Sequence, residues 1–295
     1  MPISELYGTH SDLLLEENGK DLAVRFFREI FQFERRWDVF VLWRLLEQST
    51  LFSQIKSYLE ESCIRYKLKR EEPSFFITLD CSFDEYLKRR SSKFRNYLRR
   101  MEKKLSSCGK VEVKFFGNYD KNNSCFEEIL AIERRSWKQN HRTSIASVGK
   151  QEIFYRNLYE LSSKNGRWHL LIMYLDGRAI AYDMGIVNKG TYYYLKTSFD
   201  EGFRNYSPAT VLRAQLIRDL ISRGVNYFDF PGEPYEWESQ WSNELRWHYS
   251  IVIYNSNMKA TLLSVINRLR DKLRGEVVQD TIRYHDPLDT RPETT

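Results

Sequence analysis

Apolar residues recur every three or four positions in several stretches of the first half of the chain, and this spacing predicts helices. The clearest stretch covers residues 20–33, where the pattern is set by Leu22, Phe26, Phe27, Ile30 and Phe33. Further helices are expected over 50–61, 82–107, 123–139 and 150–164. Short runs rich in β-branched and aromatic residues predict strands over 37–45, 75–79 and 111–116.

From residue 168 onward the pattern becomes that of strands. WHLLIMYL, RAIAYDMGIV and TYYYLKTSF are separated by the turn sequences Asp-Gly and Asn-Lys-Gly. Such turns supply the positive φ of tight hairpins, so these runs predict a three-stranded antiparallel meander. A helix from Pro208 to about Ser222, the strands NYFDF and RWHYSIVIY, and a helix near 259–273 are expected to follow. This order predicts a mixed α/β fold in which helices cover an antiparallel-rich sheet.

The composition fits one large domain or two small ones, because 42% of the 295 residues are apolar. Four cysteines without C-x-x-C spacing and five scattered histidines predict a reducing compartment and no metal site. No stretch approaches the roughly 20 apolar residues of a spanning helix, and the start lacks a signal-peptide pattern. We therefore expect a cytoplasmic protein that is not transmembrane, with a disordered tail, HDPLDTRPETT.

The positive charge is uneven along the chain. The net charge is +6, and residues 88–104, KRRSSKFRNYLRRMEKK, hold nine basic residues against one acid. On a helix such residues usually form a solvated face. The alternative is contact with a polyanion, such as the phosphates of CoA, a tRNA, an anionic glycan or lipid head groups.

Motifs between about residues 75 and 254 resemble those of the GNAT-type acyltransferases, more narrowly their CelD-like branch, which is related to the Fem-type aminoacyl transferases. The motifs are, in order, SFDEYLKRRSSKFRNYLRRMEKKL, IERRSW, DGRAIAYDMGI, YYYLKTSFDEGFRNYSPATVL and FDFPGEPYEWESQW. The resemblance implies an α/β fold of the GNAT type, with a mixed, antiparallel-rich sheet flanked by helices. It also implies acetyl-CoA or another acyl-CoA as cosubstrate, no metal, and a sugar or amine acceptor.

The resemblance further implies a division of the chain. Residues 1–80 resemble part of a first GNAT-like half, residues 81–255 would form the acyltransferase domain with the basic helix, and residues 256–295 a C-terminal helix and flexible tail. Several strands of the first half are missing. Because an unpaired sheet edge is a liability, we expect a shortened half or one completed by self-association or a partner protein.

On the donor side, the resemblance places the pantetheine arm along one strand and the pyrophosphate at the following helix start, where free N–H groups attract anions. The candidate cofactor-binding residues are Leu195, Lys196, Thr197, Ser198, Arg204, Asn205, Ser207, Pro208, Ala209 and Thr210. NYSPAT departs from the family pattern Q/R-x-x-G-x-G/A, because proline and alanine stand where glycines let the backbone approach. An ordinary helix start is the alternative.

Asp183 is a candidate catalytic residue because it interrupts an apolar strand. The residues that share its face, Ala179, Ala181 and Gly185, are small and leave room above the sheet. A buried carboxylate is costly unless it is paired or takes part in chemistry. A structural contact with a basic residue is the alternative.

The stretch FDFPGEPYEW is expected to form the acceptor side. Its Pro-Gly turn would place Glu233, Tyr235 and Trp237 over the acyl group. Glu233 is then the candidate base, Tyr235 the candidate proton donor to the thiolate, and Trp137 and Trp237 candidate substrate-binding residues. The alternative is a turn whose aromatic residues pack on the core.

Three hypotheses about function follow. The first is an N- or O-acetyltransferase that acts on an amino sugar or a polysaccharide precursor of the cell envelope. The second is a Fem-type transferase that uses aminoacyl-tRNA. The third is a catalytically inactive assembly subunit with the same fold.

Overall fold

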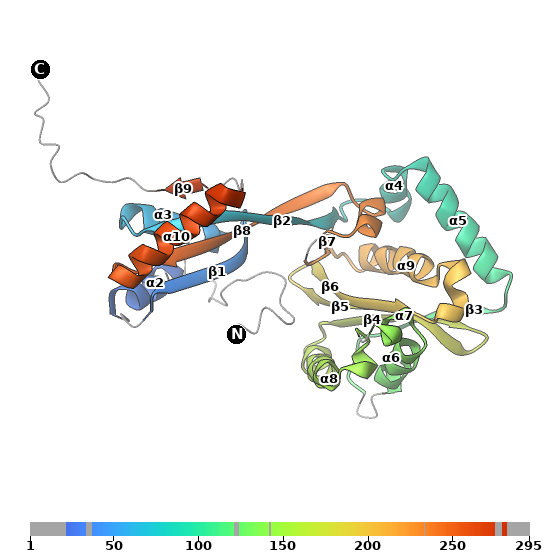
Figure 1. The fold of residues 1–295 in the computed structure, drawn as a ribbon. Coiled ribbons are helices and arrows are strands. Elements are labelled where there is room, and N and C mark those ends of the chain that lie inside the picture. The colour runs from blue at the N-terminus through green and yellow to red at the C-terminus, as the bar shows by residue number, and fades with distance from the viewer. Residues whose placement is uncertain are drawn as a thin grey trace, which may run out of the picture. The chain divides into compact units, whose positions relative to one another are not determined.

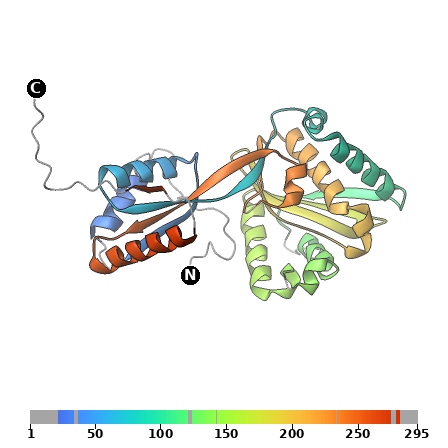
Figure 2. The same ribbon diagram turned by 45° about the horizontal axis from the view of Figure 1, so that its top comes forward.

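The computed structural model describes residues 22–33, 37–120, 124–141, 143–232, 234–274 and 279–281 (Figures 1 and 2). The chain divides into two compact units. The central unit is Phe75–Glu244, and the terminal unit combines Met1–Ser74 with Leu245–Thr295. Residues 245–255, expected in the same domain as 81–244, thus group with the N-terminal part of the chain. Among the residues described, no helix has the length and apolar character needed to cross a membrane.

The terminal unit is built around paired strands. Its elements are α2 (Leu22–Phe33), β1 (Val39–Leu46), α3 (Thr50–Glu61), the first part of β2 (Tyr66–Thr78), most of β8 (Glu244–Tyr254), α10 (Met258–Arg274) and β9 (Gln279–Thr281). β8 pairs antiparallel with β1, and β9 with β2. Apolar residues of α2 and α3 form a core with alternate residues of these strands, among them Leu68 and Ile251. α10 lies on the other face, where Lys67 of β2 contacts Asp271.

The central unit holds a mixed sheet flanked by helices. In chain order its elements are α4 (Phe83–Lys88), α5 (Ser92–Ser106), β3 (Val111–Phe116), α6 (Ser124–Arg134), α7 (Trp137–Asn140), η1 (Ile145–Ser147), α8 (Gly149–Lys164), β4 (Trp168–Leu175), β5 (Arg178–Asn188), β6 (Thr191–Phe199), η2 (Glu201–Tyr206), α9 (Pro208–Ser222), β7 (Tyr227–Asp229) and η3 (Glu236–Gln240). The strand order is β2–β7–β6–β5–β4–β3, and only β6 and β7 run parallel among these described pairs.

Two apolar clusters sandwich this sheet. One lies between the sheet and helices α5 and α9, and the other between the sheet and helices α6 and α8 (Figure 1). Successive residues of β4 alternate between them, since Leu171 and Met173 join the first cluster and Leu170 and Ile172 the second. The predicted α/β fold with a mixed, helix-flanked sheet is therefore confirmed.

The predicted meander is also confirmed. β4, β5 and β6 pair antiparallel in sequence order. Their tight turns use positive φ at Asp176 (48°) and Gly177 (82°), and at Lys189 (47°) and Gly190 (75°).

Three expected elements differ in extent. The helix expected over 82–107 is interrupted, because Ser91 accepts a hydrogen bond from the Phe94 N–H and starts a second helix, α5. The helix expected over 123–139 ends at Arg134 and resumes at Trp137. The strand expected at 75–79 is the end of the longer β2, whose central run of charged residues conceals the strand pattern.

Candidate active site

The sheet of the central unit opens between its two parallel strands. β6 and β7 pair only at Thr191–Tyr193 with Tyr227–Asp229. β7 ends there, while β6 continues to Phe199. The rest of β6 therefore has backbone groups on this side that no β7 residue pairs, and a ligand can reach them.

A cavity of about 880 Å³ lies along this opening. Its lining comes from α5, α7, β6, α9 and the segment after β7: Ser91, Lys93, Phe94, Tyr97, Trp137, Lys138, Tyr194, Thr197, Ser198, Phe199, Ala209, Thr210, Arg213, Pro231, Tyr235, Trp237, Glu238, Gln240 and Trp241. The lining is largely apolar and aromatic, with a few charged groups, as in most small-molecule sites. Those charged groups determine what chemistry the cavity can perform.

Arg213 is the buried cation of the cavity wall. Its Nε donates to Asp183 at 2.5 Å, and Asp183 also accepts from the Tyr192 hydroxyl at 3.3 Å. Burial lowers the pKa of Arg213, but the combined contributions of Asp183, Tyr194 and Tyr192 outweigh burial and leave that pKa above its usual value. The guanidinium lies 4.7 Å from the ring centre of Tyr194 and 5.0 Å from that of Trp237. Its Nη1 is buried without a hydrogen-bond partner in the described part of the chain.

Glu238 is the buried carboxylate of the cavity. It belongs to η3, only 3% of its surface is exposed, and it accepts from the Tyr235 backbone N–H at 3.0 Å. Burial raises the pKa of Glu238 to about 7, against opposing contributions from the Tyr235 N–H and Arg213. A carboxyl group with a pKa near neutrality can take up and release a proton at physiological pH.

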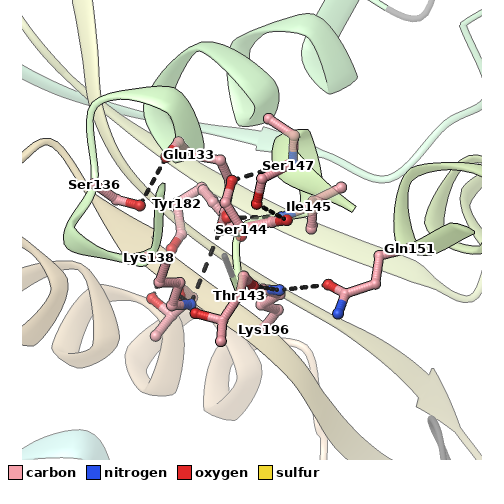
Figure 3. A network of polar contacts seen from close by, with 12 residues as sticks. Glu133, Ser136, Lys138, Thr143, Ser144, Ile145, Ser147, Gln151, Tyr182 and Lys196 are labelled. Atoms are coloured by element: carbon pink, nitrogen blue, oxygen red, sulfur yellow. Dashed lines mark hydrogen bonds and ion pairs between the residues drawn. The ribbon is translucent and has the colours of Figure 1, made fainter. Parts of the chain in front are cut away.

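Lys138 is another cation of the cavity, and it belongs to a buried polar network (Figure 3). Its Nζ donates to the Thr197 carbonyl of β6 and lies 3.9 Å from Glu133 Oε1. Glu133 is fully buried and accepts from the Tyr182 hydroxyl at 2.5 Å and from the Ile145 N–H at 3.0 Å. Burial lowers the pKa of Lys138 to about 8, although Glu133 opposes the shift.

A second, basic pocket of about 520 Å³ shares Tyr97 with the cavity. Its other lining residues are Arg100, Met101, Lys104, Arg204, Asn205 and Ser207. It joins two cations of the basic helix α5 to the segment before α9. Three cations around one pocket suit a phosphorylated ligand.

The start of α9 offers few backbone donors to such a ligand. Ser207 is left-handed, with φ of 47°, and its carbonyl already accepts from the N–H groups of Thr210 and Val211. Pro208 has no N–H, and the Ser207 hydroxyl bonds the Tyr97 hydroxyl. An anion bound in this pocket would therefore depend more on the side-chain cations than on the backbone of the helix start.

The residues chosen from the sequence are distributed over several places. The main cavity is lined by Trp137, Thr197, Ser198, Ala209, Thr210, Tyr235 and Trp237, and the basic pocket by Arg204, Asn205 and Ser207. Leu195, Lys196 and Pro208 line neither, and Lys196 instead bonds the Thr143 carbonyl (Figure 3). Asp183 is in the sheet and pairs with Arg213. This pair is the structural contact with a basic residue that was the alternative to a catalytic role. Glu233 lies outside the described residues.

Three charged residues of the cavity were not found from the sequence. Lys138 directly follows the Trp137 of the IERRSW motif, and Glu238 comes three residues after Tyr235. Arg213 stands in the mostly apolar run VLRAQLI, where a lone basic residue signals a buried partner.

Comparison with known proteins agrees with this architecture. The family described as "Acetyltransferase (GNAT) domain" matches residues 92–239. Comparison with curated protein sequences gives no match.

Among solved structures, FemX is similar with a TM-score of 0.57 and 12% identity over 86% of this chain and 81% of that one. The C-terminal domain of a putative lysylphosphatidylglycerol synthetase from Agrobacterium fabrum has a TM-score of 0.53 and 12% identity over 82% and 75% of the two chains. L-PGS from Bacillus licheniformis has a TM-score of 0.50 and 10% identity over 78% and 72%. At these identities the likeness is one of fold.

Proposed function

The chain belongs to the acetyltransferase (GNAT) domain family and is an acyltransferase, and we propose that it carries an acyl group from acyl-CoA to an amine or hydroxyl acceptor. The observation that carries the proposal is the opening between β6 and β7, beside which a buried carboxylate has a pKa of about 7. The acceptor we propose is an amino sugar or an envelope polysaccharide precursor. A CelD-like specificity and a cytoplasmic location stay predictions.

The donor fits the opening and the basic pocket. The thioester arm would lie along Thr197 and Ser198 of β6, where the strand has no β7 neighbour. The phosphates would lie against Arg100, Lys104 and Arg204 in the basic pocket. Charge-assisted contacts of this kind are stronger than neutral hydrogen bonds.

The acceptor would enter past Tyr235 and Trp237, toward Glu238. In the reaction the acceptor nitrogen or oxygen bonds the thioester carbon, the carbon–sulfur bond breaks, and the thiolate leaves with the electron pair. Glu238 takes the proton that the acceptor loses, and a proton returns to the thiolate from Lys138 or Tyr235. General acid-base assistance of this kind is worth roughly 10²- to 10⁴-fold.

This assignment places the base at Glu238, and Glu233 stays a candidate from the sequence. Glu238 is favoured because its burial adjusts its pKa to the task. Asp183 acts through Arg213, which it holds in place.

An aminoacyl-tRNA donor is the second candidate. The fold likeness to FemX and L-PGS supports it, as do the exposed cations of α5, which suit a larger polyanion than CoA. Two ionisable groups of the cavity, Glu238 and Lys138, have pKa values near neutrality, as proton transfer requires. This favours both transferase hypotheses over a catalytically inactive assembly subunit.

A binding and transfer experiment tests the proposal. The protein is mixed with acetyl-CoA, CoA or a charged tRNA, and its thermal unfolding is followed. Labelled acetyl-CoA, or a tRNA charged with a labelled amino acid, is then supplied with a set of amino sugars. We expect acetyl-CoA to raise the melting temperature and label to reach an acceptor. No shift and no transfer with acetyl-CoA would contradict the CoA proposal, and transfer from charged tRNA would establish the alternative.

A further inference from the structure

Helix α10 of the terminal unit carries a stripe of exposed apolar side chains. They are Met258, Leu262, Val265, Ile266, Leu269 and Leu273. Met258 is 91% exposed and Leu273 is 88% exposed, so the stripe continues over the length of the helix. At 3.6 residues per turn these positions fall within an arc about 100° wide.

The stripe is not the face by which α10 packs on its own unit. The opposite face carries Ala260, Ser264 and Asp271, all buried. Lys67 of β2 donates to Asp271 at 2.5 Å, and Arg65 donates to Ser264 at 3.2 Å. Figure 2 shows α10 lying along one side of the strands of its unit, and the residues of the stripe, on the helix face opposite the anchored one, are exposed. A contiguous exposed apolar stripe rimmed by polar residues is typical of an interaction surface.

Basic residues border the stripe. Lys272 flanks it on one side, and Lys259 and Arg270 flank it on the other, as the helical spacing requires. Lys259 remains 73% exposed although it pairs with Asp38 at 2.6 Å. The one acidic residue in the α10 sequence is Asp271, which is buried and already paired with Lys67. The outer half of the helix is therefore apolar at its centre and cationic at its edges.

We propose that α10 docks on the surface of an anionic lipid bilayer. A helix with an apolar face between basic borders lies in the plane of the head groups, with its apolar side chains among the acyl chains and its cations near the phosphates. This surface lies in the terminal unit, so the proposal does not rest on acyl transfer.

Charge favours a lipid surface over a second copy of the chain. Two α10 stripes packed together would bring Arg270 and Lys272 of both copies to the edges of one contact, where the helix offers no exposed acid to neutralise them. Like charges that are brought close together repel. A bilayer rich in anionic lipids supplies many phosphates without that conflict.

Co-sedimentation of the full chain with vesicles tests this. We expect binding to vesicles of phosphatidylcholine with 30 mol% phosphatidylglycerol to exceed binding to pure phosphatidylcholine by about ten-fold or more. Leu262→Gln with Leu269→Gln should weaken binding by roughly ten-fold or more, because the inserted apolar area is lost. Arg270→Gln and Lys272→Gln should each weaken it by about five-fold, and added salt should reduce that difference.

The control uses an apolar residue of matching exposure elsewhere. Leu161 on α8 is 63% exposed and Leu262 is 61% exposed, so Leu161→Gln should leave vesicle binding unchanged. Equal loss in Leu161→Gln, or no binding to the anionic vesicles, would overturn the proposal. Sedimentation velocity tests the alternative partner. If the wild type does not bind vesicles but forms a concentration-dependent dimer that the α10 double variant does not form, then α10 binds a second copy of the chain and not a bilayer. Unchanged melting temperatures establish that the variants are folded.

Discussion

The two units depart in opposite ways from the usual distribution of polar and apolar residues. The central unit buries charge, in Glu133, Asp183, Arg213 and Glu238, close to a cavity. The terminal unit exposes apolar surface along α10. Each departure costs free energy, since charge prefers water and apolar surface avoids it. Buried charge suits chemistry on a small ligand, and exposed apolar area suits a large partner.

Buried pairs occur in both units, but their surroundings differ. In the terminal unit, Lys67 and Asp271 are 2.5 Å apart and attach α10 to β2, away from the exposed stripe. In the central unit, Arg213 forms the same kind of contact with Asp183 and also lines the cavity. The comparison therefore predicts that charge changes around the cavity affect catalysis, whereas those at Lys67 and Asp271 affect only stability.

The largest expected effect is that of Glu238→Gln on turnover. If Glu238 is the base, its loss should reduce kcat by roughly 10²- to 10⁴-fold with little change in donor binding. In the wild type the rate should rise as pH increases through about 7, because only the ionised carboxylate accepts a proton. Steady-state rates between pH 5 and pH 9 measure both effects. Glu236→Gln, a change at an exposed neighbour, is the control and should behave as wild type.

The same residue makes a prediction about stability. The folded protein raises the pKa of Glu238 from its ordinary value of 4.5 to about 7, so folding favours the protonated form. That contribution is present below about pH 4.5 and is lost as pH rises through 7. Between pH 5 and pH 8, wild type should therefore lose roughly 2 to 3 kcal/mol relative to Glu238→Gln in urea unfolding. Parallel pH curves for the two proteins would contradict the assigned pKa.

Arg213→Met should cause the next largest effect, on the free energy of unfolding. It leaves the Asp183 carboxylate buried without its cation, which costs about 3 to 5 kcal/mol. The double variant Asp183→Leu, Arg213→Met should recover most of this loss, because two apolar residues replace the pair. Urea unfolding of both variants measures the difference.

The exposed pair Arg89–Asp80, at 2.9 Å, provides the comparison. Arg89→Met should cost less than about 1 kcal/mol. If Arg213→Met lowers the free energy of unfolding by as little as Arg89→Met, the buried pair neither stabilises the fold nor holds Arg213 in position.

Lys138→Met should have an intermediate effect. If the ammonium helps to return the proton, the wild-type rate should fall as pH rises through about 8, and the variant should be about ten-fold slower without that fall. Because Glu133 raises the pKa of Lys138, Glu133→Gln should move the fall to lower pH. Rates at pH 6.5 to 9.5 test this, with the exposed Lys150→Met as control. If the rate of Glu133→Gln falls at the same pH as that of the wild type, the fall does not reflect the ionisation of Lys138.

Much of the central unit follows from local sequence patterns. The meander is evident because Asp176-Gly177 and Lys189-Gly190 allow only tight turns between apolar runs. Helix α9 begins at Pro208, as its place in the first turn predicts. β2 was recognised only at its end, since its charged middle resembles a loop although the strand continues through it.

The site was harder to predict, because burial is a tertiary property. Asp183 was identified as costly in an apolar strand, but its partner Arg213 is thirty residues away, and only packing of α9 on β5 joins them. Tyr235 and Trp237 were chosen by position, whereas Glu238 differs from the neighbouring Glu236 in being buried. The sequence shows which ionisable side chains are present, but the fold determines which of them are buried away from water.

The smallest expected effect is that of the basic pocket on the donor. Arg100→Gln and Lys104→Gln each remove one cation from a pocket that remains open to water, so screening limits their contribution. Each should raise KM for acetyl-CoA about five-fold and leave kcat unchanged, because the phosphates are distant from the reacting carbon. Lys103→Gln changes the same charge on α5 outside the pocket and should have no effect. An equal increase in KM from Lys103→Gln would mean that α5 attracts the donor only through its overall charge, and that the pocket itself holds no phosphate.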